Sequence, residues 1–308
     1  MKFCLITILF ILIYIQQVLG AACCGGGSGL PSLITGDYRG QLTTSFSQAK
    51  IVGEKLHQEI PYFWPKDKTF YTRSLKIDAT YQFDNYFQFG VSSSVLMKDY
   101  RFSNGANNQD HGISDIGLTA AYCFLPELNF SRYRPVGFSF AKLTIPTGKS
   151  IYESNDPAGA DVSGKGFYIF SLGLAFVKTL GIYDWQIMGE GHSFIERTFK
   201  HNSHITKVKP GPGGSLLFSL GWSPYNSDWR LGGSISPHYE GEKVSSFNST
   251  KSRSGYELYW DTSFSLSKLL SEEYMASFNY TDQTILGPVN NTNLSRTLTF
   301  SFQKRWAL

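Results

Sequence analysis

The stretch Thr297–Trp306 alternates between polar and apolar residues except at Lys304, and no other feature constrains the fold of this chain as strongly. Its apolar members are Leu298, Phe300, Phe302 and Trp306. Because successive side chains of a strand point to opposite faces, the pattern predicts a strand with one apolar face and one polar face. About a dozen segments of roughly ten residues repeat it, which predicts an all-β chain closed into a barrel, apolar outside and polar inside.

The connections between these segments alternate in length. Every second connection is short: 84–85, 179–184, 224–228 and 267–272, with the longer stretch 125–134 as the exception. The other six are long and polar: 48–68, 98–112, 146–165, 197–212, 241–254 and 282–294. Short periplasmic turns that alternate with long extracellular loops are typical of outer-membrane barrels. We therefore predict a twelve-stranded antiparallel transmembrane β-barrel.

Aromatic residues gather at both ends of the predicted outward positions. Trp185, Trp222 and Trp229 stand at short connections, whereas Tyr168 and Tyr239 stand at long ones. Two such rings, separated by about nine to eleven residues of tilted strand, match the two boundaries of a bilayer. An aromatic content of 16% with only 17% charged residues also suits a barrel better than a cytosolic enzyme.

The N-terminus has the three parts of a secretory signal peptide. Lys2 precedes the apolar run 3–15, and small residues suited to cleavage follow it. That run is short for a membrane-spanning helix. We divide the chain into a signal peptide (1–22), a Gly-rich tail or lumen plug (23–36) and the barrel (37–308), and we expect the mature protein in the outer membrane of a Gram-negative cell.

Three cysteines remain after removal of the signal peptide. Cys23 and Cys24 stand at or near the new N-terminus, and Cys123 falls on an inward position at the periplasmic end. Exported proteins meet an oxidising compartment, which permits a disulfide from either residue to Cys123. Lipidation of Cys23 and a flexible tail with two free thiols are the alternatives, and the sequence leaves all three open.

Positively charged residues, negatively charged residues and histidines all fall on the predicted lumen side. They are Arg39, Lys76, Asp78, Asp115, Glu190, His192, Arg230, His238, Glu240, Glu257, Asp261 and Arg296. In a wide barrel such residues set ion selectivity, and in a narrow one they pair and fill the interior. Because the signs balance, we expect no strong charge preference. A net charge of +4 without a basic run gives no reason to expect binding to nucleic acid.

Two predicted strands fit the scheme poorly. The seventh has Gly189 and Gly191 on its outer face, so the pattern specifies it only weakly. The fifth, which begins near Phe138, has a charge on its apolar face. Phe138 and Phe140 set its outward phase, and that phase places Lys142 toward lipid, at a cost of roughly 2–4 kcal/mol near the bilayer centre. A one-residue bulge near Ala141 would turn Lys142 inward and Leu143 outward, so we predict a bulge there.

Two segments resemble a known family, GISDIGLTAAYCF (112–124) and FSFAKLTIPTGKS (138–150). A Gly-x-x-Asp-Ile strand followed by a strand ending in Ile-Pro-Thr-Gly is similar to the outer-membrane barrels of the MetA-pathway-of-phenol-degradation family. These are transporters loosely allied to the long-chain fatty-acid channels. Asp115 and the corner Pro146-Thr147-Gly148 occupy the matching positions. The resemblance implies an importer of small hydrophobic or aromatic compounds.

Two other functions fit a barrel: a structural or surface-binding protein and, with less support, an outer-membrane lipid hydrolase. His192 and Ser193 are adjacent in a predicted strand, so they face opposite sides and cannot form a catalytic dyad. No histidine has the spacing of a metal motif. We expect no catalytic residues, metal or cofactor. The expected partners of this monomer are outer-membrane lipid, lipopolysaccharide, the barrel-assembly machinery and small solutes.

Overall fold

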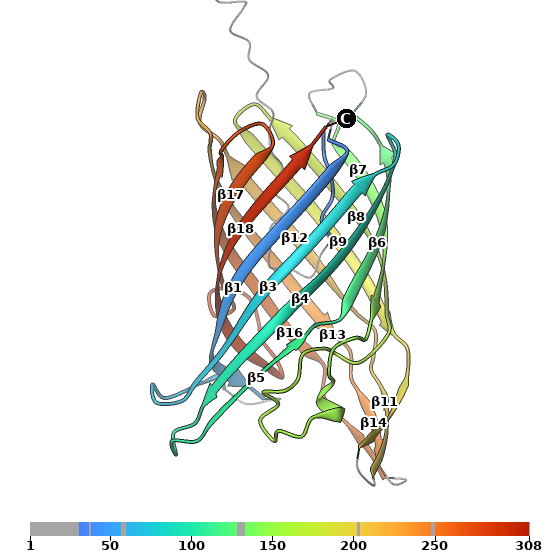
Figure 1. Cartoon of the computed structure of the whole chain (residues 1–308), viewed down its shortest axis with the longest axis vertical. Coiled ribbons are helices and arrows are strands. Elements are labelled where there is room, and N and C mark those ends of the chain that lie inside the picture. Colours follow the sequence, from blue (N-terminus) through green and yellow to red (C-terminus); the bar gives the residue numbers. More distant parts are fainter. Residues whose placement is uncertain are drawn as a thin grey trace, which may run out of the picture.

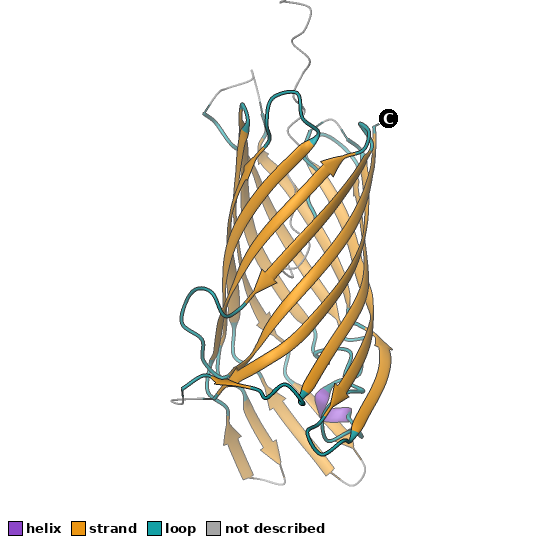
Figure 2. Ribbon diagram, turned by 90° about the vertical axis from the view of Figure 1, so that its left-hand side faces the viewer, coloured by secondary structure: helices purple, strands orange, loops and turns teal. Residues whose placement is uncertain are grey.

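A computed structural model describes residues 31–36, 38–56, 60–127, 133–201, 204–247 and 250–307. Within these residues, twelve strands pair side by side, each antiparallel to the next, and the last pairs with the first (Figure 1 and Figure 2). The predicted fold class is therefore confirmed: the chain is all-β and closes into a twelve-stranded antiparallel barrel. No helix in the described part of the chain is long and apolar enough to cross a membrane.

The barrel strands follow one another around the wall in chain order. They are β1 (Gly40–Lys55), β3 (Thr69–Gln82), β4 (Phe87–Arg101), β6 (Ile116–Leu125), β7 (Val136–Ile145), β8 (Ile169–Leu180), β9 (Tyr183–Phe194), β12 (Gly213–Trp222), β13 (Trp229–Glu240), β16 (Glu257–Leu269), β17 (Tyr274–Asp282) and β18 (Thr292–Trp306). An even strand number returns the chain to the end at which it started, so Gly40 pairs directly with Trp306.

The closing pair β1–β18 shows how alternation decides the two faces. Phe46 lies opposite Phe300 on the outer face, and both side chains are about half exposed. On the inner face the hydroxyls of Ser45 and Ser301 are 2.9 Å apart and share a hydrogen bond. A register shift by one residue would reverse both faces, so the apolar pattern fixes the register of the closure.

The outer wall carries a continuous apolar belt. Its exposed members include Leu75, Ile77, Phe89, Val91, Phe170, Leu172, Leu174, Leu216, Phe218, Phe264, Phe278, Leu298 and Phe300. An exposed apolar surface of this extent is unfavourable in water and matches the lipid-facing band of a membrane barrel. Gln41, Thr80 and Gln88 lie on the inner wall and are at most 6% exposed.

The two ends of the barrel differ, as the lengths of the connections predict. We call the end with the turns the short-turn end, and the other the long-loop end. Smaller strands extend the long-loop end: β2 (Tyr62–Phe63), β5 (Asn107–Ile113), β10 (Arg197–His201), β11 (His204–Lys209), β14 (Val244–Phe247) and β15 (Thr250–Arg253). The last four form a separate sheet in the order β10-β11-β14-β15, built from two loops that the sequence shows only as long and polar.

The predicted bulge near Ala141 is wrong. β7 pairs with β8 in unbroken register, and Phe138 and Phe140 are only 2% and 3% exposed, on the inner face. Lys142 shares that inner face, and Leu143 takes the outer one with 38% exposure. The error lay in the phase: these two aromatic side chains pack inside the barrel, and the pattern of a single strand does not show what lies opposite.

Candidate functional site in the barrel lumen

The lumen holds a cavity of about 500 Å³ toward the long-loop end. Eight strands contribute residues to its wall, because alternation turns every second residue of each strand inward. The charged side chains among its lining residues are Lys98, Asp115, Lys142, Lys165, Glu190 and Glu240. Tyr259, His192 and His238 add ring surfaces, and Leu96 and Ile169 add apolar ones. The lining is therefore mixed, with three lysines facing three carboxylates.

A segment between β7 and β8, residues 146–168, roofs this cavity, and we call it the capping loop. Asp115, just before β6, holds both of its ends. One carboxylate oxygen accepts a hydrogen bond from the backbone N–H of Gly148 at 3.0 Å, and the other accepts one from that of Lys165 at 2.8 Å. Hydrogen bonds to an ionised acceptor are among the stronger ones. The two sequence segments that carry the family resemblance therefore meet at one carboxylate.

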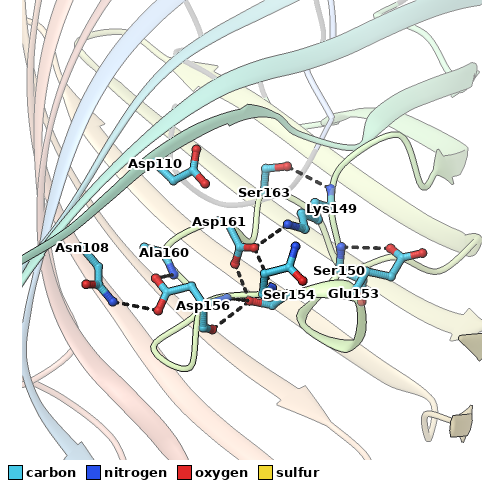
Figure 3. Close-up of polar contacts among 12 residues, drawn as sticks. Asn108, Asp110, Lys149, Ser150, Glu153, Ser154, Asp156, Ala160, Asp161 and Ser163 are labelled. Atoms are coloured by element: carbon cyan, nitrogen blue, oxygen red, sulfur yellow. Dashed lines mark hydrogen bonds and ion pairs between the residues drawn. The ribbon is translucent and has the colours of Figure 1, made fainter. Parts of the chain in front are cut away.

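A second carboxylate organises the capping loop from within (Figure 3). Asp161 accepts hydrogen bonds from the Lys149 ammonium, the Ser154 hydroxyl and the Asn155 backbone N–H. Burial alone would raise the pKa of Asp161, but these hydrogen bonds and the Lys149 charge outweigh it and lower the pKa to about 2. The loop is therefore held by a carboxylate that stays ionised in all but strongly acidic solution.

Two further contacts tie the capping loop to the wall. The Asn108 amide of β5 donates to Asp156 at 2.8 Å, a contact visible in Figure 3. The Lys98 ammonium of β4 donates to the backbone oxygen of Gly159 at 3.1 Å. Because β4 and β5 pair with each other, these two contacts fix the capping loop to one part of the wall above the cavity.

Four charged or ionisable groups form a chain across the cavity. Nε2 of His192 lies 3.1 Å from one oxygen of Glu240, and the Lys165 ammonium donates to the other at 2.9 Å. Nδ1 of His192 lies 3.7 Å from Glu190. This chain links β9, β13 and the capping loop, so opposite charges neutralise one another in the cavity instead of presenting one sign to a solute.

The lumen is also occupied at the short-turn end, by residues 31–36, which we call the N-terminal segment. Leu33 and Ile34 are only 2% and 1% exposed. The Gln88 side chain of β4 accepts a hydrogen bond from the Ile34 N–H at 2.8 Å and donates one to the Ile34 oxygen at 2.7 Å. A buried amide that pairs with both backbone groups of one residue fixes the position of this segment.

Leu33 packs on an apolar part of the inner wall, which we call the apolar stripe. The stripe consists of Ala121, Cys123, Phe138, Phe140, Ala175, Met188 and Leu217. These residues come from the contiguous strands β6, β7, β8, β9 and β12. Gly173 makes room for the stripe, because a Cβ at that position would overlap the ring of Phe140. One side of the lumen is therefore apolar, in contrast to the polar interior that alternation predicts.

Five of the twelve predicted lumen residues line the cavity: Asp115, Glu190, His192, His238 and Glu240. Several others are held in ion pairs on the inner phase: Lys76 with Asp78 (2.9 Å), Arg230 with Asp184 (2.8 Å), His238 with Asp261 (3.1 Å) and Glu257 with Lys243 (2.6 Å). Arg39 lies at the short-turn end, where its guanidinium donates to the Phe83 oxygen at 3.2 Å. A role of these residues in solute passage stays a prediction.

Arg296 departs from its predicted place in the lumen. It lies opposite Lys50 and Asp282 on the phase of Leu298, whose side chain is 47% exposed on the outer wall. Its Nε is 2.9 Å from Asp282. Arg296 and Leu298 are two residues apart in one strand, so alternation already assigns both to the outer face.

Four cavity residues were missed by sequence reasoning. Lys98 and Lys165 fall in stretches read as loops, although Lys98 continues the alternation of β4. Lys142 was expected to face inward through a bulge and does so without one, but it was not counted among the predicted lumen residues. Tyr259 lies on the inward phase of β16, and a search restricted to charged residues and histidines passed over it.

Cys123 lies within the apolar stripe, is 6% exposed, and has no disulfide partner among the residues that the structure describes. Cys23 and Cys24 lie outside the described residues, as do the signal peptide and residues 23–30 of the tail, so the cysteine alternatives stay predictions. Among the residues the structure describes, no group of three or more His, Cys, Asp or Glu side chains could hold a metal ion.

A closed barrel with an apolar outer belt and a capped internal cavity has the architecture of a transmembrane β-barrel. No protein-family model matches the sequence, and the comparison with curated proteins gave no match. Among solved structures, an outer-membrane channel from Pseudomonas putida F1 is similar with a TM-score of 0.67 and 13% identity. The alignment covers 89% of this chain and 100% of that one.

Weaker likenesses fall below a TM-score of 0.5. The toluene transporter TodX of Pseudomonas putida aligns at 0.46 with 12% identity, over 86% of this chain and 87% of that one. The transport unit of the autotransporter AIDA-I from Escherichia coli aligns at 0.47 with 8% identity, over 91% and 94%. At these identities the likeness to the channel of Pseudomonas putida F1 shows the fold, and membership of the phenol-degradation family stays a prediction.

Proposed function

We propose that this protein is an outer-membrane channel for small solutes that carry an apolar or aromatic part. One observation carries the proposal: a barrel with an apolar outer belt encloses a cavity of about 500 Å³ beside an apolar stripe. Ligand cavities combine mostly apolar walls with a few placed polar groups, and this lumen offers both.

The outer-membrane location rests on physical grounds. A closed sheet leaves no backbone group unpaired toward lipid, and the apolar belt supplies the surface that hydrocarbon solvates. The signal peptide predicted in residues 1–22 supplies the route of export. The similar structure from Pseudomonas putida F1 is described as an outer-membrane channel, which agrees with this location.

The class of solute follows from the two kinds of wall. The cavity offers lysines and carboxylates in equal number, which suits a solute with a small polar or charged group of either sign. The apolar stripe lies on the wall of the same lumen. There the side chains of Phe138, Phe140, Met188 and Leu217 offer a surface for the apolar or aromatic part of a solute. The family resemblance implies the same class of solute.

Passage requires that the N-terminal segment leave the stripe. Its two hydrogen bonds to Gln88 are worth about 1 kcal/mol each, and burial of Leu33 and Ile34 contributes roughly 1.5–3 kcal/mol each. Ordering six residues costs about 1–2 kcal/mol per residue. The opposing terms nearly cancel, so the segment is suited to reversible displacement.

Swelling of liposomes that contain the full-length protein tests the proposal. We expect faster entry of an aromatic acid such as benzoate than of a sugar of similar size. Gln88→Leu removes both hydrogen bonds to Ile34 and should raise benzoate entry at least about fivefold, because each lost bond costs about 1 kcal/mol or more. Gln186→Leu is the matched control, since Gln186 is also buried in the lumen (4% exposed) and has no hydrogen bond to the N-terminal segment among the described residues.

Three outcomes would count against the channel. Equal rates of entry for benzoate and sugar would contradict the proposed preference for apolar or aromatic solutes. If Gln88→Leu and Gln186→Leu raised benzoate entry equally, the N-terminal segment would not control passage through the lumen. No entry of either solute in wild type or variant would leave a closed structural barrel, and a parallel assay of lipid hydrolysis would then test the enzymatic alternative.

A further inference from the structure

The small sheet at the long-loop end has one packed face and one free face. On the packed face, Phe199 and Val208 are 2% and 0% exposed and contact Phe167 and Ile169. Figure 1 shows β11 and β14 beyond the end of the barrel wall. Because residues alternate along each strand, the neighbours of Phe199 and Val208 in sequence face the other way.

The free face is strongly basic. Its cations are Lys200, Lys207, Lys209, Lys251 and Arg253, which we call the basic face, and all five are exposed. The register aligns them: Lys209 and Arg253 both lie opposite Val244, and Lys207 and Lys251 both lie opposite Ser246. Neighbouring strands lie about 4.8 Å apart, so the cations of each row are about 10 Å apart.

Acidic residues do little to neutralise this face. The strands β10, β11, β14 and β15 contain no Asp or Glu. Lys207 lies 2.6 Å from Glu196, but both side chains are largely exposed and such a pair is worth little. Within the described residues, no carboxylate lies within 4 Å of Lys200, Lys209, Lys251 or Arg253. Glu240, Glu242 and Glu257 also stand near these strands in sequence, and Glu240 and Glu257 are paired with Lys165 and Lys243.

The basic face lies next to the edge of the apolar belt. Tyr168, Tyr239 and Tyr256 stand at the long-loop ends of β8, β13 and β16, where a ring of tyrosines marks the bilayer boundary. β10 continues from β9 beyond that ring, and the exposed apolar side chain of Ile205 lies among the cations. The proposed outer-membrane location would place head groups of the outer leaflet at this level.

We propose that the basic face binds the phosphate groups of outer-leaflet glycolipid head groups. The inference rests on the proposed outer-membrane location but not on transport. Exposed cations near an anionic membrane surface are worth about 1 kcal/mol each, and alternation with apolar residues suits a surface that is part head group and part acyl chain. The two alignments of cations could hold two phosphates of one molecule.

Native mass spectrometry of the full-length protein in detergent tests this, with bisphosphorylated lipid A as the probe. We expect Lys209→Gln/Arg253→Gln to bind it about 30-fold more weakly, from about 1 kcal/mol per lost cation. Lys66→Gln/Arg101→Gln removes one exposed lysine and one exposed arginine of the long-loop end outside the small sheet. This control should bind within about twofold of wild type.

Other probes separate the sources of phosphate. Dephosphorylated lipid A should bind equally to wild type and to Lys209→Gln/Arg253→Gln. Inorganic phosphate and heparin should also bind no more tightly to wild type than to this variant. Equal binding of lipid A to both double variants, or tighter binding of heparin than of lipid A, would overturn the proposal. Lys209→Arg/Arg253→Lys keeps both positive charges and should retain binding of lipid A, so that weaker binding of the Gln variant is assigned to the lost charges. Liposome swelling by the Gln variant should equal that of wild type, which separates lipid A binding from the channel function.

Discussion

At the scale of single residues, the best-defined ion pair of the lumen is that of Arg230 and Asp184, near the short-turn end. Nε of Arg230 donates to one carboxylate oxygen at 2.8 Å and a terminal nitrogen donates to the other at 2.5 Å. Both side chains are at most 10% exposed. Gly221 makes this fork possible, because a Cβ there would overlap the guanidinium. Buried charges tolerate such a place only when they are paired.

We predict that Arg230→Ala lowers the free energy of unfolding by about 3–5 kcal/mol, because it leaves Asp184 buried without a partner. Arg230→Ala/Asp184→Ala should recover much of that loss, since no unpaired charge remains. Urea unfolding in lipid vesicles measures both. Lys76→Ala is the comparison: its partner is Asp78, but the lysine is 36% exposed, so the loss should stay below about 1 kcal/mol. A loss in Lys76→Ala as large as in Arg230→Ala would contradict the argument from burial.

At the scale of elements, two carboxylates tie the capping loop together. Asp115 joins its two ends to β6, and Asp161 joins its inner turns. A short 3-10 helix, η1 (Ile151–Glu153), begins at Ser150 with a capping box, in which Glu153 accepts from the Ser150 N–H. The ties to Asp161 depend on its carboxylate being ionised.

The pH dependence of the capping loop follows from Asp161. Its pKa is lowered to about 2 in the folded loop from an ordinary value of 3.8, so its stabilisation is fully present above about pH 4 and is lost as the pH falls toward 2. Pepsin cleavage within residues 146–168, normalised to an unfolded chain at each pH, should therefore rise between pH 4 and pH 2. Asp161→Asn should be cleaved faster at pH 5 and show a smaller rise. A rise of equal size in the variant would assign the effect to other carboxylates.

At the scale of the whole molecule, closure and the belt depend on each other. The β1–β18 pair closes the sheet, and the outward residues of this pair belong to the apolar belt. Hydrocarbon solvates the outer face only if every backbone N–H and C=O is paired, and a closed sheet alone achieves this for strands. The barrel is therefore expected to be stable in a bilayer or detergent and not as a free monomer in water.

Phe300→Arg tests the placement of the belt. Phe300 is 53% exposed in the middle of β18, so an arginine there should lower the free energy of unfolding in lipid by about 2–4 kcal/mol. Leu42→Arg is matched, because Leu42 also lies on the outer face of the closing pair but near the short-turn end. Its cost should fall to about 0–1 kcal/mol. Folding titrations in vesicles measure both, and equal costs would mean that this wall does not cross a bilayer.

Most of the wall could be predicted from local pattern. The alternation of apolar and polar residues in β18, β3 and β8 depends only on which face of the strand meets lipid. That condition is the same for every strand, so twelve strands and two kinds of connection follow from residue order. β7 shows where this fails. Phe138 and Phe140 look like lipid-facing residues, but Leu33, Ala121 and Met188 form an apolar surface inside the barrel that accepts them.

The sequence by itself determined the closed barrel, its apolar belt and the lengths of its connections, because lipid and water impose a period of two on every strand regardless of its neighbours. Only the tertiary structure decided which residues meet inside. Three features each join segments that are far apart in the chain. They are the contacts of Asp115 with the capping loop, the packing of Leu33 on the apolar stripe and the basic face of the small sheet. Their partners are set by strand order and register around a closed circle, which no local pattern encodes.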